Sequence, residues 1–451
     1  MPPSSSILLR GATVLTLDTE ATVLPSADVL VRDGRIERLD RGIERPGPGR
    51  VLDVAGCYLL PGLVQGHVHL GQTLFRGLAE DRRLLAWLRE RIWPLEAAHD
   101  DESAYWSGLL GAAECLLGGT TTIQDIGIGP GFPGLLAAIR ESGLRAYAGL
   151  CLMDEGDGLP PGLAGTTDRV LEQTEELGAA LTSEGESARV RYALNPRFIL
   201  SCSDALWSEV RALAEHRGWP VHTHALEQVE ETARVRELKD GRDEIAYFAE
   251  NGILGTDLRI AHGVGLGAEH LRAVSRCRFS VVHCPSSNLK LGSGIAPIVA
   301  VRAAGIPVGI GADGAPCNND LDALEELRLA ALLQKLDAGP DRFSGLDALR
   351  LATSEGARAL GLEAEIGTVE VGKAADLLVL DGERPEMWAG DDADPHDLVT
   401  FGASRAAVRH VLVSGDLLVE DGRLTALDLV AIRRRADRAL ASLLSRARLP
   451  G

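Results

Sequence analysis

The segment 61-PGLVQGHVHL-70 carries the strongest local signal in this 451-residue chain. An apolar run ends there in His67 and His69, which have one residue between them. Residues two apart in a β-strand point to the same side, so both imidazoles are expected to face the space beyond the strand end. Two histidines at this spacing are weak support for a metal site by themselves, so further ligands must come from elsewhere in the chain.

Around this segment, short apolar, β-branched runs alternate with helical stretches at the spacing of βα units. The predicted strands lie at residues 60–69, 120–125, 145–153, 189–196, 220–225, 259–263, 279–284 and 307–313. Amphipathic helices are expected over 103–117 and 427–444, the second with arginines on one face. Eight such strands predict an α/β protein with a parallel (β/α)8 barrel, or TIM barrel.

Both ends of the chain have a different hydropathy pattern. Residues 7–53 alternate apolar and polar side chains between Gly and Asp turns, and the same alternation is found at 367–381 and 408–424. We therefore expect a small composite β-sandwich domain built from both chain ends. The predicted domains are 1–57 (first part of the β domain), 58–364 (the (β/α)8 barrel) and 365–451 (second part of the β domain with the last helix).

Composition narrows the possible partners. The formal net charge is -19, from 46 Lys and Arg against 65 Asp and Glu, and such a surface should repel nucleic acid polymers and anionic membranes. No apolar run reaches about 18 residues and no signal peptide is recognised, so no membrane span is expected. Seven cysteines without a CxxC pair fit reduced thiols in the cytoplasm.

Four further polar residues lie at the ends of different predicted strands: His224, His262, His283 and Asp313. Functional groups of (β/α)8 enzymes come from these strand ends. Together with the first two histidines they offer the imidazole and carboxylate ligands that zinc or iron accepts. The alternative, polar groups that are merely satisfied in the core, requires several independent coincidences.

Glu227 follows His224 by three residues, where its carboxylate could reach over the metal without binding it. A bound metal lowers the pKa of a coordinated water toward neutrality, so that a metal-bound hydroxide can attack a ring carbon. We expect Asp313 to accept the water proton, Glu227 to protonate the ring nitrogen and His262 to hydrogen-bond the hydroxide. Taken alone, Glu227 would be read as a solvated glutamate in the first turn of a helix.

The lysines bear on the number of metal ions. The chain contains only Lys239, Lys290, Lys335 and Lys373, so none precedes the fifth predicted strand. Binuclear barrel hydrolases commonly bridge their two metals with a modified lysine on the fourth strand. Unless a carboxylate does the bridging, one divalent metal per chain is therefore expected, with zinc first, iron as an alternative and manganese less favoured.

The chain resembles a known protein family from about residue 7 to residue 424. The chain resembles the amidohydrolase superfamily, in the branch of methylthioadenosine/S-adenosylhomocysteine deaminases, 5'-deoxyadenosine deaminases and triazine chlorohydrolases. The motifs that carry this resemblance are PGLVQGHVHLGQTLFRGLAEDRRLLAWLRERIWPLE (61–96), VHTHALE (221–227), HCPSSNLKLGSGIAP (283–297) and GADGAPCNNDLDALEELRLAALLQK (311–335).

The resemblance implies roles for individual residues. The metal ligands would be His67, His69, His224 and Asp313, with Glu227 as acid and base and His262 as an imidazole beside the metal. The predicted substrate contacts are Glu96 on the ribose hydroxyls, Trp87 as a pocket aromatic, Arg197 near the ring, and His283 from its strand end.

Two departures from the family pattern bear on the substrate. Arg197 stands where the adenosylhomocysteine-type enzymes have a histidine, and Leu150 where they have an arginine for the amino-acid tail. We therefore expect hydrolytic deamination of an adenosine with a small or uncharged 5' group, such as 5'-deoxyadenosine or methylthioadenosine. The alternatives are an aminohydrolase or chlorohydrolase of a free s-triazine, guanine-like or pterin ring, and a non-catalytic scaffold, which the complete ligand set disfavours. A homo-oligomer, with a dimer as the first choice, is expected.

Overall fold

The computed structural model describes residues 6–44, 47, 49–185, 188–390, 392–447 and 449. Two compact units are found. The first consists of Met1–Gln65, Ala113–Thr122 and Asp322–Leu427, and the second of Gly66–Ala112, Ile123–Leu321 and Asp428–Gly451. Each unit is described by itself.

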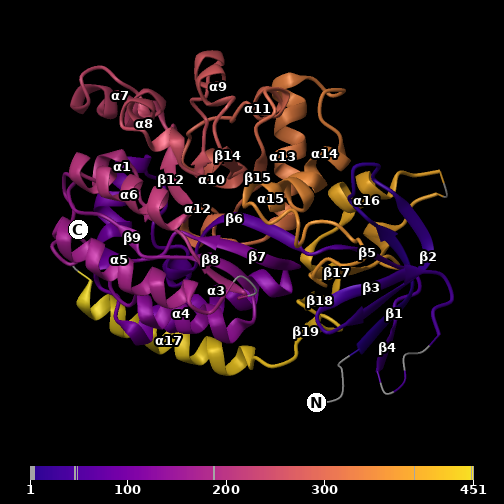
Figure 1. The fold of residues 1–451 in the computed structure, drawn as a ribbon. Coiled ribbons are helices and arrows are strands. Elements are labelled where there is room, and N and C mark those ends of the chain that lie inside the picture. The colour runs from indigo at the N-terminus through magenta and orange to yellow at the C-terminus, as the bar shows by residue number, and fades with distance from the viewer. Residues whose placement is uncertain are drawn as a thin grey trace. The chain divides into compact units, whose positions relative to one another are not determined.

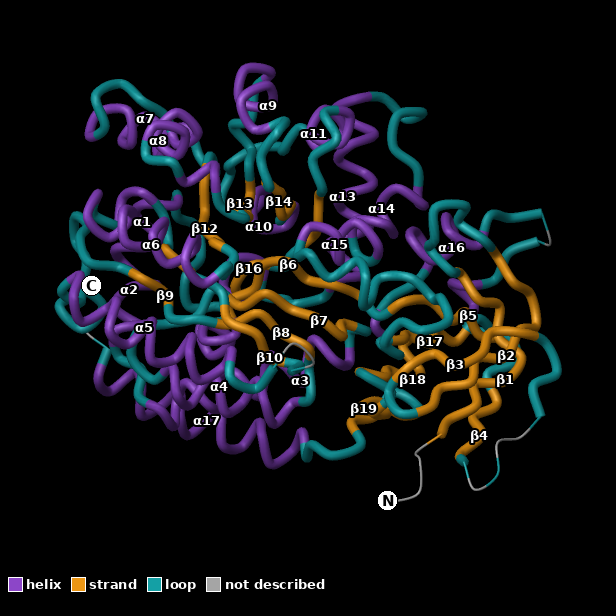
Figure 2. Tube along the Cα trace, viewed as in Figure 1, coloured by secondary structure: helices purple, strands orange, loops and turns teal. Residues whose placement is uncertain are grey.

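Strands from both chain ends form one sheet of the first unit (Figures 1 and 2). Its strands are β1 (Ser6–Leu15), β2 (Val23–Arg32), β3 (Arg35–Asp40), β4 (Arg50–Asp53), β5 (Cys57–Pro61), β17 (Leu377–Asp381), β18 (Val408–Val413), β19 (Asp416–Glu420) and β20 (Arg423–Leu424). The two ends meet where β5 runs antiparallel to β17, with Leu59 opposite Val379. Both side chains are fully buried, and the composite β domain expected from the sequence is confirmed.

A second sheet has nine strands, of which eight follow in the order β10-β8-β7-β6-β15-β14-β13-β12 and the short β16 (Asp313–Gly314) pairs with β6. The eight are β6 (Leu63–His69), β7 (Thr120–Asp125), β8 (Arg145–Ala148), β10 (Val190–Tyr192), β12 (Val221–Ala225), β13 (Leu258–His262), β14 (Phe279–His283) and β15 (Val308–Ile310). Leu194, just after β10, bridges to Val221 in parallel, and its carbonyl accepts the His222 N–H at 2.8 Å. This contact joins the two ends of the sheet, so the predicted (β/α)8 barrel is confirmed.

The predicted strands differ from the observed ones in two respects. Residues 60–61 belong to β5 rather than to the first barrel strand, which begins at Leu63. Three expected strands are each split, which adds the short strands β9 (Cys151–Leu152), β11 (Asn195–Pro196) and β16 (Asp313–Gly314). At one split the two backbones approach closely and glycine is required, because a Cβ on Gly149 would lie 2.0 Å from the Ala193 carbonyl oxygen.

Helices cover the strands (Figure 1). In the second unit or partly in it lie α1 (Leu84–Trp87), α2 (Trp93–Ala97), α3 (Asp101–Leu117), α4 (Phe132–Ser142), α5 (Thr167–Thr182), α6 (Asp204–Arg217), α7 (Val229–Leu238), α8 (Glu244–Glu250), α9 (Ala268–Val274), α10 (Pro285–Lys290), α11 (Ile298–Ala303), α12 (Ala315–Asn318) and α17 (Leu429–Arg446). The first unit contains α13 (Ala323–Ala338), α14 (Gly345–Leu351), α15 (Ser354–Ala359) and α16 (Pro395–Gly402). Tighter or wider turns are η1 (Leu70–Phe75), η2 (Leu88–Ile92), η3 (Ile199–Ser201), η4 (Ile253–Gly255), η5 (Pro385–Met387) and η6 (Arg405–Ala407).

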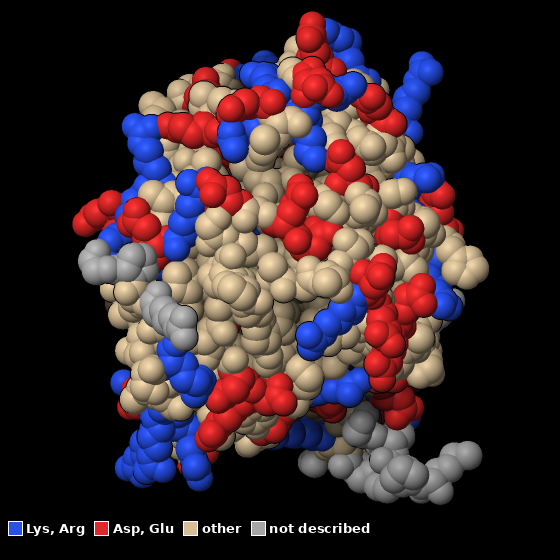
Figure 3. Space-filling view, turned by 90° about the vertical axis from the view of Figure 1, so that its left-hand side faces the viewer, with Lys and Arg blue, Asp and Glu red and all other residues tan. Residues whose placement is uncertain are grey.

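The last helix, α17, buries Ile432, Ala436, Ala439 and Leu443, which recur at helical spacing. Its Arg446 forms an ion pair with Asp100 at 3.1 Å. The helix is therefore an amphipathic cover of the second unit, and within the described residues no helix has the length and apolar character needed to span a membrane. Acidic and basic side chains are interspersed over the face shown in Figure 3.

Candidate metal centre and active site

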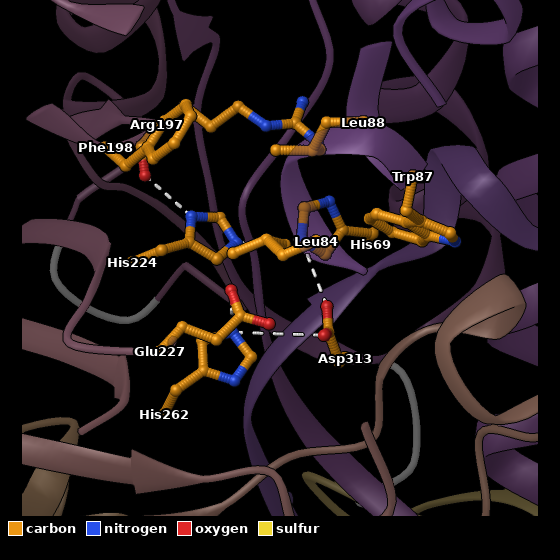
Figure 4. A pocket seen from close by; sticks show the side chains of 10 residues that line it. All are labelled: His69, Leu84, Trp87, Leu88, Arg197, Phe198, His224, Glu227, His262 and Asp313. Carbon is orange, nitrogen blue, oxygen red and sulfur yellow. Dashed lines mark hydrogen bonds and ion pairs between the residues drawn. The ribbon is translucent and has the colours of Figure 1, made fainter. Parts of the chain in front are cut away.

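Four side chains from three strands meet at one end of the barrel. His67 and His69 end β6, His224 lies near the end of β12, and Asp313 begins β16, which pairs with β6. One nitrogen or oxygen of each lies within 4.8 Å of the corresponding atoms of the others, and all four side chains are buried. Figure 4 shows three of them, His69, His224 and Asp313, directed toward a common space. The side chains singled out at the strand ends are thus brought together.

The hydrogen bonds behind His67 fix which of its nitrogens carries the proton. Nδ1 of His222 lies 3.2 Å from the Arg259 carbonyl oxygen and must donate to it, so Nε2 of His222 is an acceptor. Nδ1 of His67 lies 2.8 Å from that Nε2 and therefore donates. Nε2 of His67 consequently presents a lone pair to the centre, and it is buried without a hydrogen-bond partner.

His224 follows the same rule. Its Nδ1 donates to the Arg197 carbonyl oxygen at 2.6 Å, so its Nε2 presents a lone pair 3.2 Å from Nε2 of His69. Burial holds the pKa of His67 below its ordinary value and that of His69 and His224 well below it. The imidazoles are therefore neutral, which is the state that binds metals.

Asp313 supplies the negative charge of the centre. Burial by itself would raise the pKa of Asp313, but its polar neighbours His67, His69 and His262 hold that pKa well below the ordinary value. Its Oδ1 lies 3.3 Å from Nε2 of both His67 and His69, and its Oδ2 accepts a hydrogen bond from Ser287 at 2.7 Å. The left-handed backbone of Asp313, with φ of 62°, is a strained conformation of the kind found at functional sites.

These atoms fit a divalent metal ion. Ligands held about 2.1 Å from a tetrahedral zinc ion lie about 3.4 Å apart, close to the separations of 3.2 and 3.3 Å found between His69, His224 and Asp313. The lone pair on Nε2 of His67 faces Oδ1 of Asp313 at 3.3 Å, and these two groups repel one another unless a cation lies between them. The partnerless Nε2 of His67 completes a set of three neutral imidazoles and one carboxylate, and the centre is a divalent-metal site.

Glu227 and His262 stand beside this centre. Nδ1 of His262 donates to the Asn288 amide oxygen at 2.9 Å, and its Nε2 faces Oε2 of Glu227 at 3.5 Å and Oδ2 of Asp313 at 3.9 Å. Burial first, and then the charge of Asp313, raise the pKa of Glu227 well above its ordinary value. A glutamic acid that holds its proton near neutral pH can act as a proton donor.

A cavity opens over the centre. It is lined by His69, Leu84, Trp87, Leu88, Arg197, Phe198, His224, Glu227, His262 and Asp313 (Figure 4). Its volume of about 20 Å³ has room for about one water molecule. Trp87 thus lies where the sequence places it, and a larger molecule can enter only if side chains such as Leu84, Trp87 or Leu88 shift.

Glu96 lies behind this wall, at 1% exposure, and is absent from the residues that line the cavity. Its Oε2 accepts a hydrogen bond from Arg197 at 2.7 Å, and its Oε1 accepts one from Gln72 at 2.8 Å. Gln72 in turn lies 3.1 Å from Nδ1 of His69, so the carboxylate is linked to a metal-site histidine. The pairing of Glu96 with Arg197 was not foreseen from the sequence.

His283 is placed differently from the other strand-end histidines. It is fully buried, both ring nitrogens lack a hydrogen-bond partner within the described part of the chain, and it does not line the cavity. Sequence reasoning also missed Gln72, His222, Ser287 and Asn288, which orient the site residues. His222 had a signal, because it stands two residues before His224 on the same strand face.

The chain matches the Amidohydrolase family over residues 58–418. It is 35% identical over 442 residues to a 5'-deoxyadenosine deaminase of Methanobrevibacter smithii, covering 97% of this chain and 98% of the relative. It is 35% identical over 446 residues to a 5-methylthioadenosine/S-adenosylhomocysteine deaminase of Halobacterium salinarum, covering 98% and 99%.

Solved structures agree with this assignment. A zinc-bound adenosine deaminase from Xanthomonas campestris superposes with a TM-score of 0.90 at 31% identity, covering 98% of this chain and all of that one. A zinc complex of an atrazine chlorohydrolase from Arthrobacter aurescens reaches a TM-score of 0.86 at 26% identity, covering 96% and 100%. With the fold and the metal site, these matches define a metal-dependent hydrolase. The chain belongs to the amidohydrolase family, which confirms the resemblance drawn from its motifs.

Proposed function

We propose that this chain is a hydrolytic deaminase that binds one zinc ion through His67, His69, His224 and Asp313 and releases ammonia from a 5'-modified adenosine. The observation that carries the proposal is the convergence of these four ligand atoms under a cavity that also contains Glu227. The names of the relatives and the zinc in the neighbouring structures support the substrate class and the metal. The absence of any lysine before Lys239 supports a single ion, since the usual bridging residue is missing.

The metal, when bound, acidifies a water molecule so that it becomes a nucleophile near neutral pH. Asp313 accepts the water proton, and Glu227 delivers a proton to the ring nitrogen next to the carbon under attack. His262, held by Asn288, hydrogen-bonds the oxygen that adds to this carbon. A carbon–oxygen bond forms and the carbon–nitrogen bond breaks. The amino group takes the proton held by Asp313 and leaves as ammonia, the added hydroxyl returns its proton to Glu227 as the carbonyl forms, and the ring nitrogen keeps the proton that it received.

Glu96 is proposed to recognise the ribose hydroxyls. It already accepts one hydrogen bond on each oxygen, and a carboxylate has further lone pairs that a vicinal diol can occupy once the cavity wall moves. His283, Trp87 and Arg197 remain predicted substrate contacts.

Replacing Glu96 with Gln should lower kcat/KM for 5'-deoxyadenosine by about 10- to 100-fold, because a hydrogen bond to a charged group contributes about 1.5–3 kcal/mol. Turnover of a free base should change far less. The matched control is Glu90→Gln, an exposed glutamate of the same segment paired with Arg82. Equal losses of activity for the nucleoside and the free base would exclude the ribose role. Thermal unfolding would show whether loss of the buried ion pair with Arg197 has lowered the stability of the protein.

The second candidate is hydrolysis of a free s-triazine, guanine-like or pterin ring, favoured by the likeness to the atrazine chlorohydrolase. A coupled ammonia assay over 5'-deoxyadenosine, methylthioadenosine, guanine and pterins, with chloride release from a chlorotriazine, separates the two. If both nucleosides are inert and a free ring turns over, the substrate class proposed here is wrong and the metal-dependent chemistry stands.

Three further properties stay predictions: the domain boundaries after residues 57 and 364, a cytoplasmic location, and a homo-oligomeric state. The last can be checked by light scattering of the purified protein.

A further inference from the structure

We infer that Glu231, on the first turn of α7, is the positioning residue that fixes Glu227 over the metal site. It takes no part in the predicted chemistry, and the inference rests on the acid role proposed above for Glu227. One oxygen of its carboxylate, Oε2, accepts the backbone N–H of Glu227 at 2.9 Å and that of Gln228 at 3.3 Å.

The carboxylate of Glu227 has no hydrogen bond of its own among the described residues that would fix its direction. Within the described residues its Oε1 is buried without a hydrogen-bond partner, and its Oε2 has a contact of only 3.5 Å with His262. The preceding residue, Leu226, has a φ of 55°, which turns the chain sharply after β12. The direction of the Glu227 carboxylate therefore depends on its backbone, and the backbone is held by Glu231.

A capping box is the ordinary explanation for a glutamate at this position, and Gln228 and Glu231 do form one at the start of α7. Two observations go beyond it. The shorter of the two bonds reaches Glu227, one residue outside the helix cap. Furthermore, Glu231 is only 1% exposed, whereas a capping glutamate ordinarily lies at the surface.

Two other glutamates, Glu227 and Glu244, lie near Glu231, so a buried glutamate at this position lowers the stability of the fold. Burial first, and then the charges of Glu244 and Glu227, raise the pKa of Glu231 well above the ordinary value. Glu244 is itself buried and accepts a hydrogen bond from Thr232 at 2.9 Å. A solvent-exposed glutamate could cap the helix equally well, so the buried position of Glu231 favours a further role beside capping.

The same carboxylate reaches the cavity wall through Gln228. The side-chain oxygen of Gln228 accepts the backbone N–H of Leu84 at 3.3 Å, and its amide donates to the Leu291 carbonyl oxygen at 2.7 Å. Leu84 lines the cavity. Glu231 thus holds the backbone of Glu227 directly and contacts the cavity-lining Leu84 through Gln228.

The test compares Glu231→Gln, which keeps an oxygen acceptor, with Glu231→Asp, which keeps the charge and withdraws the acceptor by about 1.5 Å. Aspartate should lower kcat by about 10- to 100-fold with KM altered less than about threefold, and glutamine should stay within about threefold of wild type. Metal content should remain that of wild type in both variants. Glu237→Gln, an exposed glutamate of the same helix, is the matched control.

A second measurement does not depend on activity. Hydrogen exchange followed by mass spectrometry should show faster exchange for the peptide around residues 226–230 in Glu231→Asp, and wild-type exchange there in Glu231→Gln. Wild-type kcat and exchange in the aspartate variant would overturn the inference. So would equal losses in both variants that track a lower unfolding midpoint, since that result indicates a structural cap. If wild-type protein releases no ammonia from any substrate, the proposed function fails, and the exchange data alone decide whether Glu231 fixes this loop.

Discussion

Replacing His224 with Ala should abolish stoichiometric metal binding and lower kcat by at least about 10³-fold. The imidazole presents its Nε2 lone pair to the centre because its Nδ1 is committed to the Arg197 carbonyl oxygen. Removing one of four ligands weakens the ion's attachment, and a metal stabilises the charge of the transition state by several kcal/mol, each 1.36 kcal/mol being a factor of ten.

The measurement is metal content by mass spectrometry beside the ammonia assay, with the same assay after treatment of wild-type protein with a chelator. His216→Ala is the matched control, because His216 is an exposed histidine at the end of α6. Full metal content and turnover in His224→Ala would contradict the proposed ligand set.

Replacing Glu227 with Gln should lower kcat by about 10² to 10⁴-fold while the metal stays bound, since glutamine cannot deliver a proton. Retained metal is expected because Glu227 lies outside the group of four ligand atoms. This combination separates a loss of proton transfer from a loss of the ion.

The control for that variant is Glu237→Gln on the helix that follows, α7, at a surface side chain paired with Arg234. Solvent isotope effects add a second readout, because a slowed proton transfer should become more sensitive to heavy water. A Glu227→Gln protein that deaminates at the wild-type rate would require another proton donor.

The convergence of the four proposed metal ligands could be predicted because strand geometry has a simple rule. Alternate residues of a strand share a face, and parallel barrel strands end on one side, so His67, His69, His224 and Asp313 had to approach one another once the strands were placed. The split of three strands was not predictable in this way. The apolar pattern runs through the interruptions, and it does not mark the close approach of Gly149 to Ala193 that accompanies one of them.

The surroundings of the ligands were harder to foresee. The ion pair between Glu96 and Arg197 joins a residue of α2 to one just after β11, and each had been assigned to the substrate separately. Gln72 belongs to η1 and Asn288 to the short helix α10, each directly after a barrel strand, and the directions of their side chains depend on packing. Such contacts need the coordinates, since no periodicity connects the segments.

The wide separation in the chain of the residues in β6, β12 and β16 has a consequence for assembly. An unfolded chain cannot bring such distant donors to one ion without a large loss of loop entropy, so a tight binding site exists only in the native barrel. An ion that binds only the native state raises its stability through mass action. The ion should therefore stabilise the folded barrel by linking its beginning, middle and end. The melting temperature should rise as the metal concentration increases.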